Sequence, residues 1–153
     1  MFKTISLFLV LALVIGALLV VAFWDDITAP RLDTATKQLI SEACAEQGIG
    51  NLNWKAKDRQ PNSVRYYGHY EGYEVFHHWP ENVDRTRSGG YQFVQGIDFC
   101  YAYAGCVIYA YKDGKVSKLA DISWSEDSLK AIRKQHGRYK NGIDNSTARV
   151  LPA

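Results

Sequence analysis

The sequence predicts an α+β protein: an N-terminal transmembrane helix, then a small domain with an antiparallel sheet of about four to five strands and two flanking helices. Three observations predict this class. First, residues 5–24 form an uncharged apolar run. Second, Glu71-Gly72 and Asp113-Gly114 each lie between two β-rich segments, as the turn of a hairpin does. Third, helical periodicity appears before and after these hairpins. The expected order in the domain is α-β-β-β-β-α, with both helices on one side of the sheet.

The apolar run is long enough to cross a membrane. About 20 residues in a helix, at ~1.5 Å per residue, span the ~30 Å hydrocarbon core of a bilayer. Lys3 precedes the run and two aspartates follow it, which places residues 1–4 in the cytoplasm and the later residues in the periplasm or outside the cell. The alternative is a signal peptide cleaved near Ala22, but such a peptide has a shorter apolar core of ~7–15 residues.

A linker over residues 25–32 and a folded domain over residues 33–140 are expected next. The first helix of the domain is expected to begin at Asp33 or Thr34, because either side chain can accept a hydrogen bond from the free backbone amides of a first turn. Gly48 is expected to end it. The apolar residues at helical spacing are Leu32, Leu39, Ile40, Ala43 and Cys44.

Residues 64–70 and 73–79 read as the first hairpin, because both are rich in β-prone residues and Glu71-Gly72 suits a two-residue turn. In that register the expected cross-strand pairs are Tyr70 with Tyr73, His69 with Glu74, and Tyr67 with Phe76. Residues 80–90 are polar and glycine-containing, and they are expected to form a loop.

Residues 91–94 and 97–111 are β-prone, and Asp113-Gly114 predicts a turn into a strand at 115–119. A continuous strand through Ala104-Gly105 gives an aromatic face that includes Tyr101, Tyr103, Tyr109 and Tyr111. The opposite face is then made of small residues that include Cys100 and Cys106. The alternative is a turn at Ala104-Gly105, which mixes the two faces.

A helix is expected after Ser123, with Ser123 or Ser125 as its cap and Gly137 as its end. Leu129 and Ile132 mark its buried face, and residues 141–153 are left as a C-terminal tail. The exposed face is basic through Lys130, Arg133 and Lys134.

The three cysteines allow one disulfide, which an exported domain would retain. Cys44 lies on the apolar helix face, and Cys100 and Cys106 lie on the small face of the strand, so a bridge from Cys44 to either is the leading interpretation. Three buried free thiols are the next. A bridge between Cys100 and Cys106 requires the strand to fold back, because six residues of strand span about 20 Å at ~3.3 Å each.

The histidines read as ordinary surface residues. His77 and His78 are neighbours in a strand and point to opposite faces, so they do not share one ion. His69 opposite Glu74 reads as a polar cross-strand pair. No catalytic or phosphate-binding motif is present, and we expect no metal, no cofactor and no enzymatic activity. A net charge of +2 from 18 basic and 16 acidic residues gives no reason to expect a nucleic-acid partner.

Two features suit a protein partner: the tyrosine face formed by Tyr101, Tyr103, Tyr109 and Tyr111, and the basic helix face formed by Lys130, Arg133 and Lys134. A merely solvated surface explains both features as well and is the commoner situation. No resemblance to a known family emerges from these residues.

The sequence therefore leads to a single-pass membrane-anchored envelope protein, held in the lipid bilayer by residues 5–24, whose exported domain is a non-enzymatic interaction module for another envelope or membrane protein. The alternative is an exported inhibitor or immunity-type protein directed at a cell-wall enzyme or toxin, acting through Arg85 and Arg87 in the loop at 80–90. A hydrolase with Asp98 and Glu74 in its site is the weakest interpretation.

Overall fold

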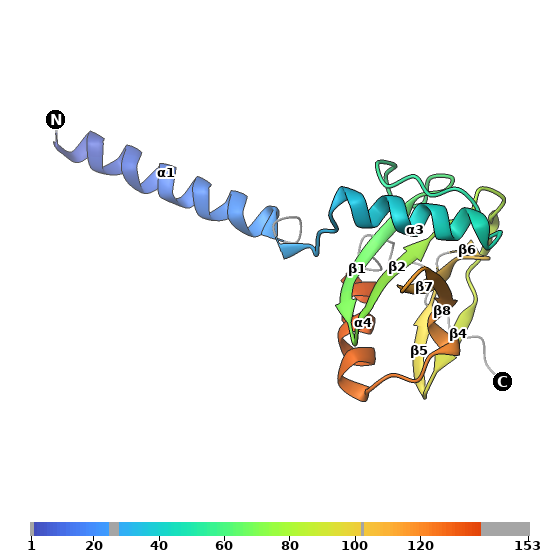
Figure 1. Ribbon diagram of the computed structural model, residues 1–153. Coiled ribbons are helices and arrows are strands. Elements are labelled where there is room, and N and C mark those ends of the chain that lie inside the picture. The colour runs from blue at the N-terminus through green and yellow to red at the C-terminus, as the bar shows by residue number, and fades with distance from the viewer. Residues whose placement is uncertain (1, 25–27, 102, 139–153) are drawn as a thin grey trace. The chain divides into compact units, whose positions relative to one another are not determined.

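Two units make up the chain in the computed structural model, Met1–Pro30 and Arg31–Ala153. The structure describes residues 2–24, 28–101 and 103–138, without the side chains of residues 2–7, 22, 84–88, 91, 104 and 138. Part of the linker expected over 25–32 and all of the tail expected over 141–153 lie outside the described residues. Figure 1 labels α1 in the first unit, and α3, α4 and most of the strands in the second.

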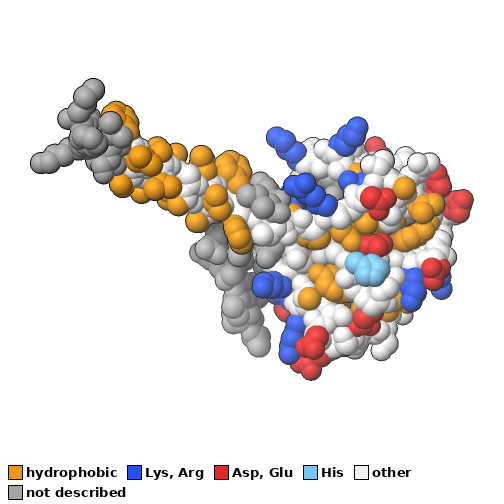
Figure 2. All heavy atoms as spheres, turned by 60° about the vertical axis from the view of Figure 1, so that its left-hand side comes forward, with side chains coloured by type: hydrophobic (Ala, Val, Ile, Leu, Met, Phe, Trp, Pro, Cys, Tyr) orange, Lys and Arg blue, Asp and Glu red, His pale blue; other side chains and the backbone are white. Residues whose placement is uncertain are grey.

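The long helix of the first unit is α1 (Phe2–Ala22). Figure 2 shows hydrophobic side chains over the described length of this helix. The exposed fractions of its large apolar residues run from 47% at Val20 to 75% at Val21. A helix in a soluble domain normally buries one apolar stripe, so this exposure sets α1 apart from the other helices. Within the described residues, no helix has both the length and the apolar character needed to cross a membrane.

The second unit begins with α3 (Thr34–Glu46), close to where the sequence predicts a helix. The Asp33 carboxylate accepts a hydrogen bond from the Thr36 amide at 2.9 Å and caps the first turn. The buried side chains of α3 are Ile40, Ala43 and Cys44. The expectation that Leu39 shares their face is wrong, because this residue lies about 100° around the helix from Ile40 and is 52% exposed.

The central sheet confirms the α+β class and its antiparallel character. It has the strand order β1-β2-β7-β8, and its strands are β1 (Val64–Tyr70), β2 (Tyr73–His78), β7 (Val107–Lys112) and β8 (Lys115–Lys118). Both predicted hairpin turns are confirmed. Glu71 and Gly72 have φ angles of 53° and 82°, and Asp113 and Gly114 have φ angles of 50° and 80°. Positive φ at both positions is the geometry that two-residue hairpins favour.

A β-bulge interrupts the first hairpin. The predicted pairs of Tyr70 with Tyr73 and of His69 with Glu74 are present, but Phe76 lies opposite Tyr66 instead of Tyr67. The register shifts between Tyr66 and Gly68, whose φ is 128°. The pairing predicted for Tyr67 is therefore wrong, because β1 has one more residue than β2 at this point.

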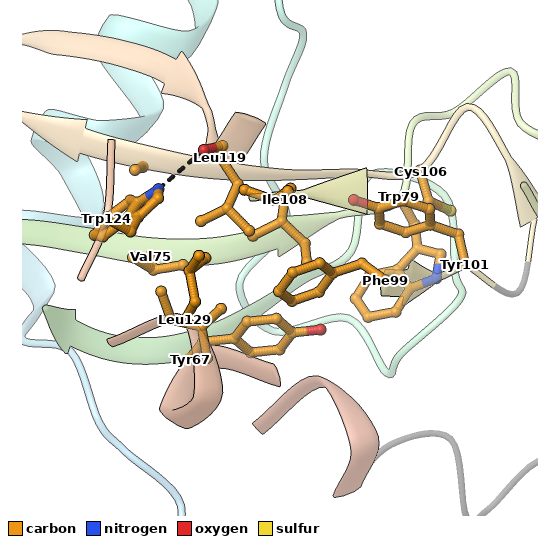
Figure 3. Packing of buried hydrophobic residues seen from close by; sticks show 13 residues of the cluster. Tyr67, Val75, Trp79, Phe99, Tyr101, Cys106, Ile108, Leu119, Trp124 and Leu129 are labelled. Atoms are coloured by element: carbon orange, nitrogen blue, oxygen red, sulfur yellow. Dashed lines mark hydrogen bonds between the residues drawn. The ribbon is translucent and has the colours of Figure 1, made fainter. Parts of the chain in front are cut away.

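The two faces of the central sheet each carry a hydrophobic cluster. On one face, here called the α3 face, α3 packs against Val64, Phe76 and Val116. The other face, here called the α4 face, packs against α4 (Glu126–Arg138). Its buried residues include Tyr67, Val75, Ile108, Ala110, Leu129 and Ile132, several of which Figure 3 labels. The expectation that both helices cover one side is therefore wrong: the strands carry apolar side chains in both directions, so each face needs its own cover.

The chain leaves the central sheet after β2 and returns at β7, and we call residues 79–106 the excursion. Four short strands lie within it: β3 (Asp84–Ser88) pairs with β6 (Tyr103–Ala104), and β4 (Tyr91–Val94) pairs with β5 (Ile97–Cys100). The region expected to be a loop at 80–90 thus contains a strand. The turn between β4 and β5, at Gln95-Gly96, has φ angles of 48° and 81°, the same positive-φ geometry as the turns at Glu71-Gly72 and Asp113-Gly114.

The continuous strand expected over 97–111 is also wrong. The chain turns at Gly105, which has a φ of 92°, and the Cys106 amide donates a hydrogen bond to the Tyr103 carbonyl at 3.4 Å. The alternative turn at Ala104-Gly105 is the one that the chain forms. Because glycine adopts positive φ without strain, Gly105 provides the reversal that the β-prone residues around it conceal.

The last helix, α4, is capped by Ser125, whose hydroxyl oxygen accepts a hydrogen bond from the Ser128 amide at 3.3 Å. The Glu71 carboxylate accepts hydrogen bonds from the Ser125 amide at 3.0 Å and from the Ser125 hydroxyl at 2.6 Å, which ties the first hairpin turn to the start of α4. The helix includes Gly137 and extends to Arg138. The stop predicted at Gly137 is therefore wrong, because this glycine keeps a helical conformation.

Candidate functional site

Three polar rings meet inside the α4 face, and we call Tyr67, His77 and His136 the histidine–tyrosine cluster. Tyr67 comes from the bulge in β1, His77 from β2 and His136 from the last turns of α4. The Tyr67 hydroxyl lies 3.1 Å from His77 Nδ1 and 2.8 Å from His136 Nδ1. His136 Nε2 lies 2.7 Å from the Cys100 carbonyl oxygen. One network of hydrogen bonds therefore joins four elements of the fold.

The partners fix the direction of each hydrogen bond when both imidazoles are neutral. A carbonyl oxygen only accepts, so His136 Nε2 carries the proton that it donates to Cys100. His136 Nδ1 is then an acceptor and receives the hydrogen bond of the Tyr67 hydroxyl. The Tyr67 oxygen in turn accepts from His77 Nδ1–H. This assignment leaves His77 Nε2 as a lone pair.

Aromatic rings enclose the cluster. Trp79 stacks on His77 with ring centroids 3.9 Å apart. Tyr101 lies 5.5 Å from His77 and 5.6 Å from His136, and Phe99 lies 5.7 Å from His136. Among the described residues, neither His77 Nε2 nor Trp79 Nε1 has a hydrogen-bond partner. A buried imidazole lone pair without a donor is uncommon, because the loss of its hydration is not compensated.

Burial lowers the pKa of His77 well below 6.5, and the positive charge that His136 and His78 can carry lowers it further. His77 is therefore neutral at physiological pH. The expectation that the histidines are surface residues is confirmed for His69, whose side chain is 58% exposed. It is wrong for the other three: the exposed fractions are 3% for His77, 1% for His78 and 5% for His136. The physical reason is that aromatic rings and apolar side chains cover both faces of β2.

His78 lies on the α3 face, opposite in direction to His77, as the strand alternation predicts. Burial lowers its pKa, and neither of its ring nitrogens has a hydrogen-bond partner among the described residues. Over residues 2–24, 28–101 and 103–138, no three histidine, cysteine, aspartate or glutamate side chains gather closely enough to hold a metal ion.

A second polar group lies at the turn end of the α3 face. The Tyr66 hydroxyl donates a hydrogen bond to Glu74 Oε2, and His69 Nδ1 lies 2.8 Å from Glu74 Oε1. Burial first, and the hydrogen bond to Glu74 next, raise the pKa of Tyr66. The His69 side chain is 58% exposed, so solvent screens its pairing with Glu74 and the pair contributes little to stability. The structure thus places Glu74, a residue of the hydrolase interpretation, in a cross-strand pair.

The three cysteines are unbridged. Cys44 belongs to the cluster on the α3 face, whereas Cys106 belongs to the cluster on the α4 face, so the central sheet lies between them. A bridge between Cys44 and Cys106 is therefore incompatible with this fold. Cys100 ends β5, and its carbonyl oxygen lies 2.7 Å from His136 Nε2 on the α4 face, whereas Cys44 packs on the α3 face. Burial raises the pKa of the Cys44 thiol to about 12 and that of the Cys106 thiol to about 11, which makes both poor nucleophiles.

The tyrosines predicted to share one interaction face do not do so. Tyr101 is 6% exposed and donates a hydrogen bond to Gln92 Oε1 at 2.5 Å, and Tyr103 packs partly against the same cluster. Tyr109 and Tyr111 pack against the cluster on the α3 face. The turn at Gly105 separates the two pairs, because it breaks the strand that would have aligned them.

The basic residues of α4 lie where the sequence places them, on the helix surface away from its buried side. Lys130 Nζ is 2.5 Å from Glu126 Oε1, and both side chains are largely exposed. Arg133 is half-buried, and its Nη2 lies 3.8 Å from Asp98 Oδ1. Lys134 is exposed. Arg85 and Arg87, proposed for the inhibitor interpretation, have side chains outside the described set.

The sequence-based interpretation missed the histidine–tyrosine cluster, although one signal for it was readable. His136 follows Leu129 by seven residues and Ile132 by four, so it shares their buried face. His77 and Trp79 are two residues apart and lie on one side of the chain, which brings their rings together. The bulge that turns Tyr67 inward has no comparable signal apart from Gly68.

Comparison with protein-family models, with curated proteins and with solved structures finds no match for this chain.

Proposed function

We propose that this chain is a single-pass membrane-anchored envelope protein whose exported α+β domain acts as a non-enzymatic interaction module. The observation that carries the proposal is the exposed apolar surface of α1, where large residues such as Leu13 and Leu18 are 69% and 63% exposed. Moving one apolar side chain of this size from water into an apolar environment gains about 1.5–3 kcal/mol. The eleven large apolar side chains described as exposed on α1 therefore favour a surrounding of lipid hydrocarbon.

The charges on the two sides of the apolar run favour export of the C-terminal domain. Lys3 precedes the apolar run and Asp25 and Asp26 follow it, which favours a cytoplasmic N-terminus and a C-terminal domain in the periplasm or outside the cell. The run of residues 5–24 in the sequence, together with the exposure of the side chains described on α1, is what supports an anchor.

The non-enzymatic role is supported by the place of the acid–base groups. The imidazoles that the structure brings together, His77 and His136, are buried under aromatic rings and hydrogen-bonded to Tyr67 and to a backbone carbonyl. The exposed pair of His69 and Glu74 is a cross-strand contact. A catalytic base must reach the proton that it removes, and buried groups engaged in structural bonds do not.

The partner surface is proposed to include the exposed basic side of α4, represented by Lys130 and Lys134, and the half-buried rings of Tyr109 and Tyr111 on the other face of the domain. These are two separate surfaces in this fold, so a partner contacts one of them. Tyrosine side chains are enriched at protein interfaces, and the two lysines offer positive charge to an acidic surface of a partner.

The anchor is tested by fractionation. The full chain, carrying a C-terminal tag, is expected to remain in the membrane fraction after alkaline extraction, and a chain of residues 31–153 is expected in the soluble fraction. Replacing Leu13 and Val14 by aspartate supplies the matched control, since it keeps the length and removes the apolar character. A mature protein that begins near residue 23 would show a cleaved signal peptide and a secreted domain.

The interaction module is tested by crosslinking in intact cells, with a photoreactive residue at position 134 or position 111. Each position reports one surface, and a partner captured through only one of them identifies the binding side. Loss of capture in Lys130→Glu/Lys134→Glu, with folding intact, assigns the surface to α4. Inhibition of a wall enzyme by the purified protein would instead favour the inhibitor interpretation.

A further inference from the structure

The attachment of α4 to the rest of the domain depends on the histidine–tyrosine cluster at its C-terminal end. Leu129 and Ile132 supply the apolar contacts of the helix, and Glu71 binds its first residues through Ser125. In the last turns, His136 holds the Tyr67 hydroxyl through Nδ1 and the Cys100 carbonyl through Nε2. The end of α4 is thus joined to β1 and β5 through one imidazole.

His77 sits behind this attachment with one unused acceptor. Its Nδ1–H is committed to Tyr67, and its Nε2 lone pair has no donor among the described residues. A proton added to the ring goes to Nε2, and the new N–H then lies in a site that is 3% exposed and offers it no acceptor there. Burying a charge without a partner is costly, so the protonated ring favours a structure in which water reaches it.

The groups around His77 do not compensate such a charge. The structure places these titratable or charged residues next to His77: Arg65 and Tyr67 of β1, His78 of β2, Tyr101 after β5, Cys106 before β7, and His136 of α4. Arg65 is cationic and pairs with Asp58. The ring centroid of His136 is 5.6 Å away, and a positive charge there lowers the pKa of His77 further. No carboxylate described here acts on His77.

We propose that His77 is a proton-binding site that controls the attachment of α4: a proton taken up at Nε2 loosens the helix from β1 and β5. The proton site and the helix are linked through Tyr67, which bonds His77 on one side and His136 on the other. When His77 moves toward water, the Tyr67 hydroxyl loses the hydrogen bond from His77 Nδ1–H. The Tyr67 ring is then held less firmly, which weakens the hydrogen bond from its hydroxyl to His136 Nδ1.

The sign of the effect follows from linkage. An opened domain exposes His77, whose pKa returns to its ordinary value near 6.5, whereas burial lowers that pKa in the closed domain. The open state therefore binds more protons below pH 6.5, and the closed state loses stability as the pH falls through that value. For one proton, the equilibrium constant for opening rises by up to about tenfold per pH unit below ~6.5.

The experiment measures hydrogen exchange of the full chain in detergent micelles between pH 7.5 and pH 4.5, with rates corrected for the intrinsic effect of pH. In the wild type, we expect the protection of the α4 peptide to fall by up to about tenfold per pH unit below ~6.5, before that of the α3 peptide. His77→Asn keeps an N–H near the position of Nδ1 and does not titrate. This variant is expected to retain α4 protection to a pH at least one unit lower, and His69→Gln, an exposed control, is expected to behave as the wild type.

Two outcomes would overturn the proposal: α4 protection that is unchanged down to pH 4.5, and identical pH dependence in the wild type and His77→Asn. The His77→Asn substitution removes a buried ring and can itself disturb folding. A second measurement therefore uses the wild type alone. ¹⁵N-histidine NMR is expected to show His77 neutral with a bare Nε2 until α4 opens. Protonation of His77 near pH 6.5 with α4 still protected contradicts the proposal as well.

Discussion

The phenol of Tyr67 reaches the interior of the α4 face because the bulge gives β1 one residue more than β2 at this point. Its hydroxyl then satisfies two imidazoles, one as an acceptor and one as a donor. A hydroxyl is the smallest group that can do both at once. The buried histidines thus depend on a residue whose position is set by backbone register.

The first prediction concerns this hydroxyl. Tyr67→Phe keeps the ring and removes the group that both imidazoles share, so we expect a loss of about 1–3 kcal/mol in the free energy of unfolding. Urea unfolding of the full chain in detergent, followed by circular dichroism, measures it. Tyr111→Phe, which removes a hydroxyl from a half-buried ring of β7, is the control and is expected to change stability by less than about 0.5 kcal/mol. Equal losses in the two variants would show that the cluster contributes no stability.

The second prediction concerns the thiols. In the native protein, Cys100 is expected to react with iodoacetamide first, because it is half-buried, whereas Cys44 and Cys106 are 0% and 5% exposed with raised pKa values. Mass spectrometry of peptides after timed alkylation measures the order. Unfolding without reductant is expected to release three alkylatable thiols. A mass two units lower in the untreated protein would instead reveal a disulfide.

At the scale of elements, turn chemistry predicts more than strand periodicity does. The hairpins at Glu71-Gly72 and Asp113-Gly114 were predictable because a two-residue turn with glycine second has few alternatives. Gln95-Gly96 has the same form, yet the β-prone residues after it read as one long strand. Alternation carries less information here, because strands buried on both faces show no polar side to reveal a break.

The third prediction concerns the turn between β7 and β8. Gly114 has a φ of 80° and no atom within 4 Å of an added Cβ, so Gly114→Ala isolates the conformational cost. We expect a destabilisation of about 1–2 kcal/mol from the left-handed backbone of an L residue. Gly90→Ala, where the backbone is ordinary and the space is equally open, is expected to be near neutral. Thermal or urea unfolding of both variants makes the comparison, and equal stabilities would contradict the turn geometry.

At the scale of the whole molecule, both hydrophobic clusters lie within residues 31–153. The fourth prediction is that a chain of residues 31–153 unfolds cooperatively in the absence of detergent, because its core needs no residue of α1. Its unfolding midpoint, compared with that of the full chain in the same mild detergent, is expected to agree within a few degrees. A non-cooperative transition in the short chain would show that the first unit is needed for folding.

The class of the molecule was predictable from its sequence, but its layering was not. Hairpins and terminal helices follow from local signals such as Asp33 and Gly114, which act within a few residues. The choice of face for each helix depends on contacts between distant residues, as between Cys44 and Tyr109 or between His136 and Tyr67. The same long-range contacts make the histidine–tyrosine cluster, which is why the sequence alone misplaced its histidines at the surface.

The excursion starts and finishes at neighbouring places in the sheet, because His78 and Val107 are paired across β2 and β7. The chain thus leaves the central sheet at the end of β2 and returns beside that point at the start of β7. The register between these two strands therefore does not depend on the length of the excursion. We therefore expect the excursion to tolerate changes in length while the β1–β2 and β7–β8 hairpins remain in place. A segment that replaces the excursion must still supply apolar side chains to the cluster on the α4 face, because Val94, Phe99 and Tyr101 belong to that cluster. Natural or engineered changes in sequence and length are therefore expected at the exposed residues of the excursion and not at its buried apolar residues.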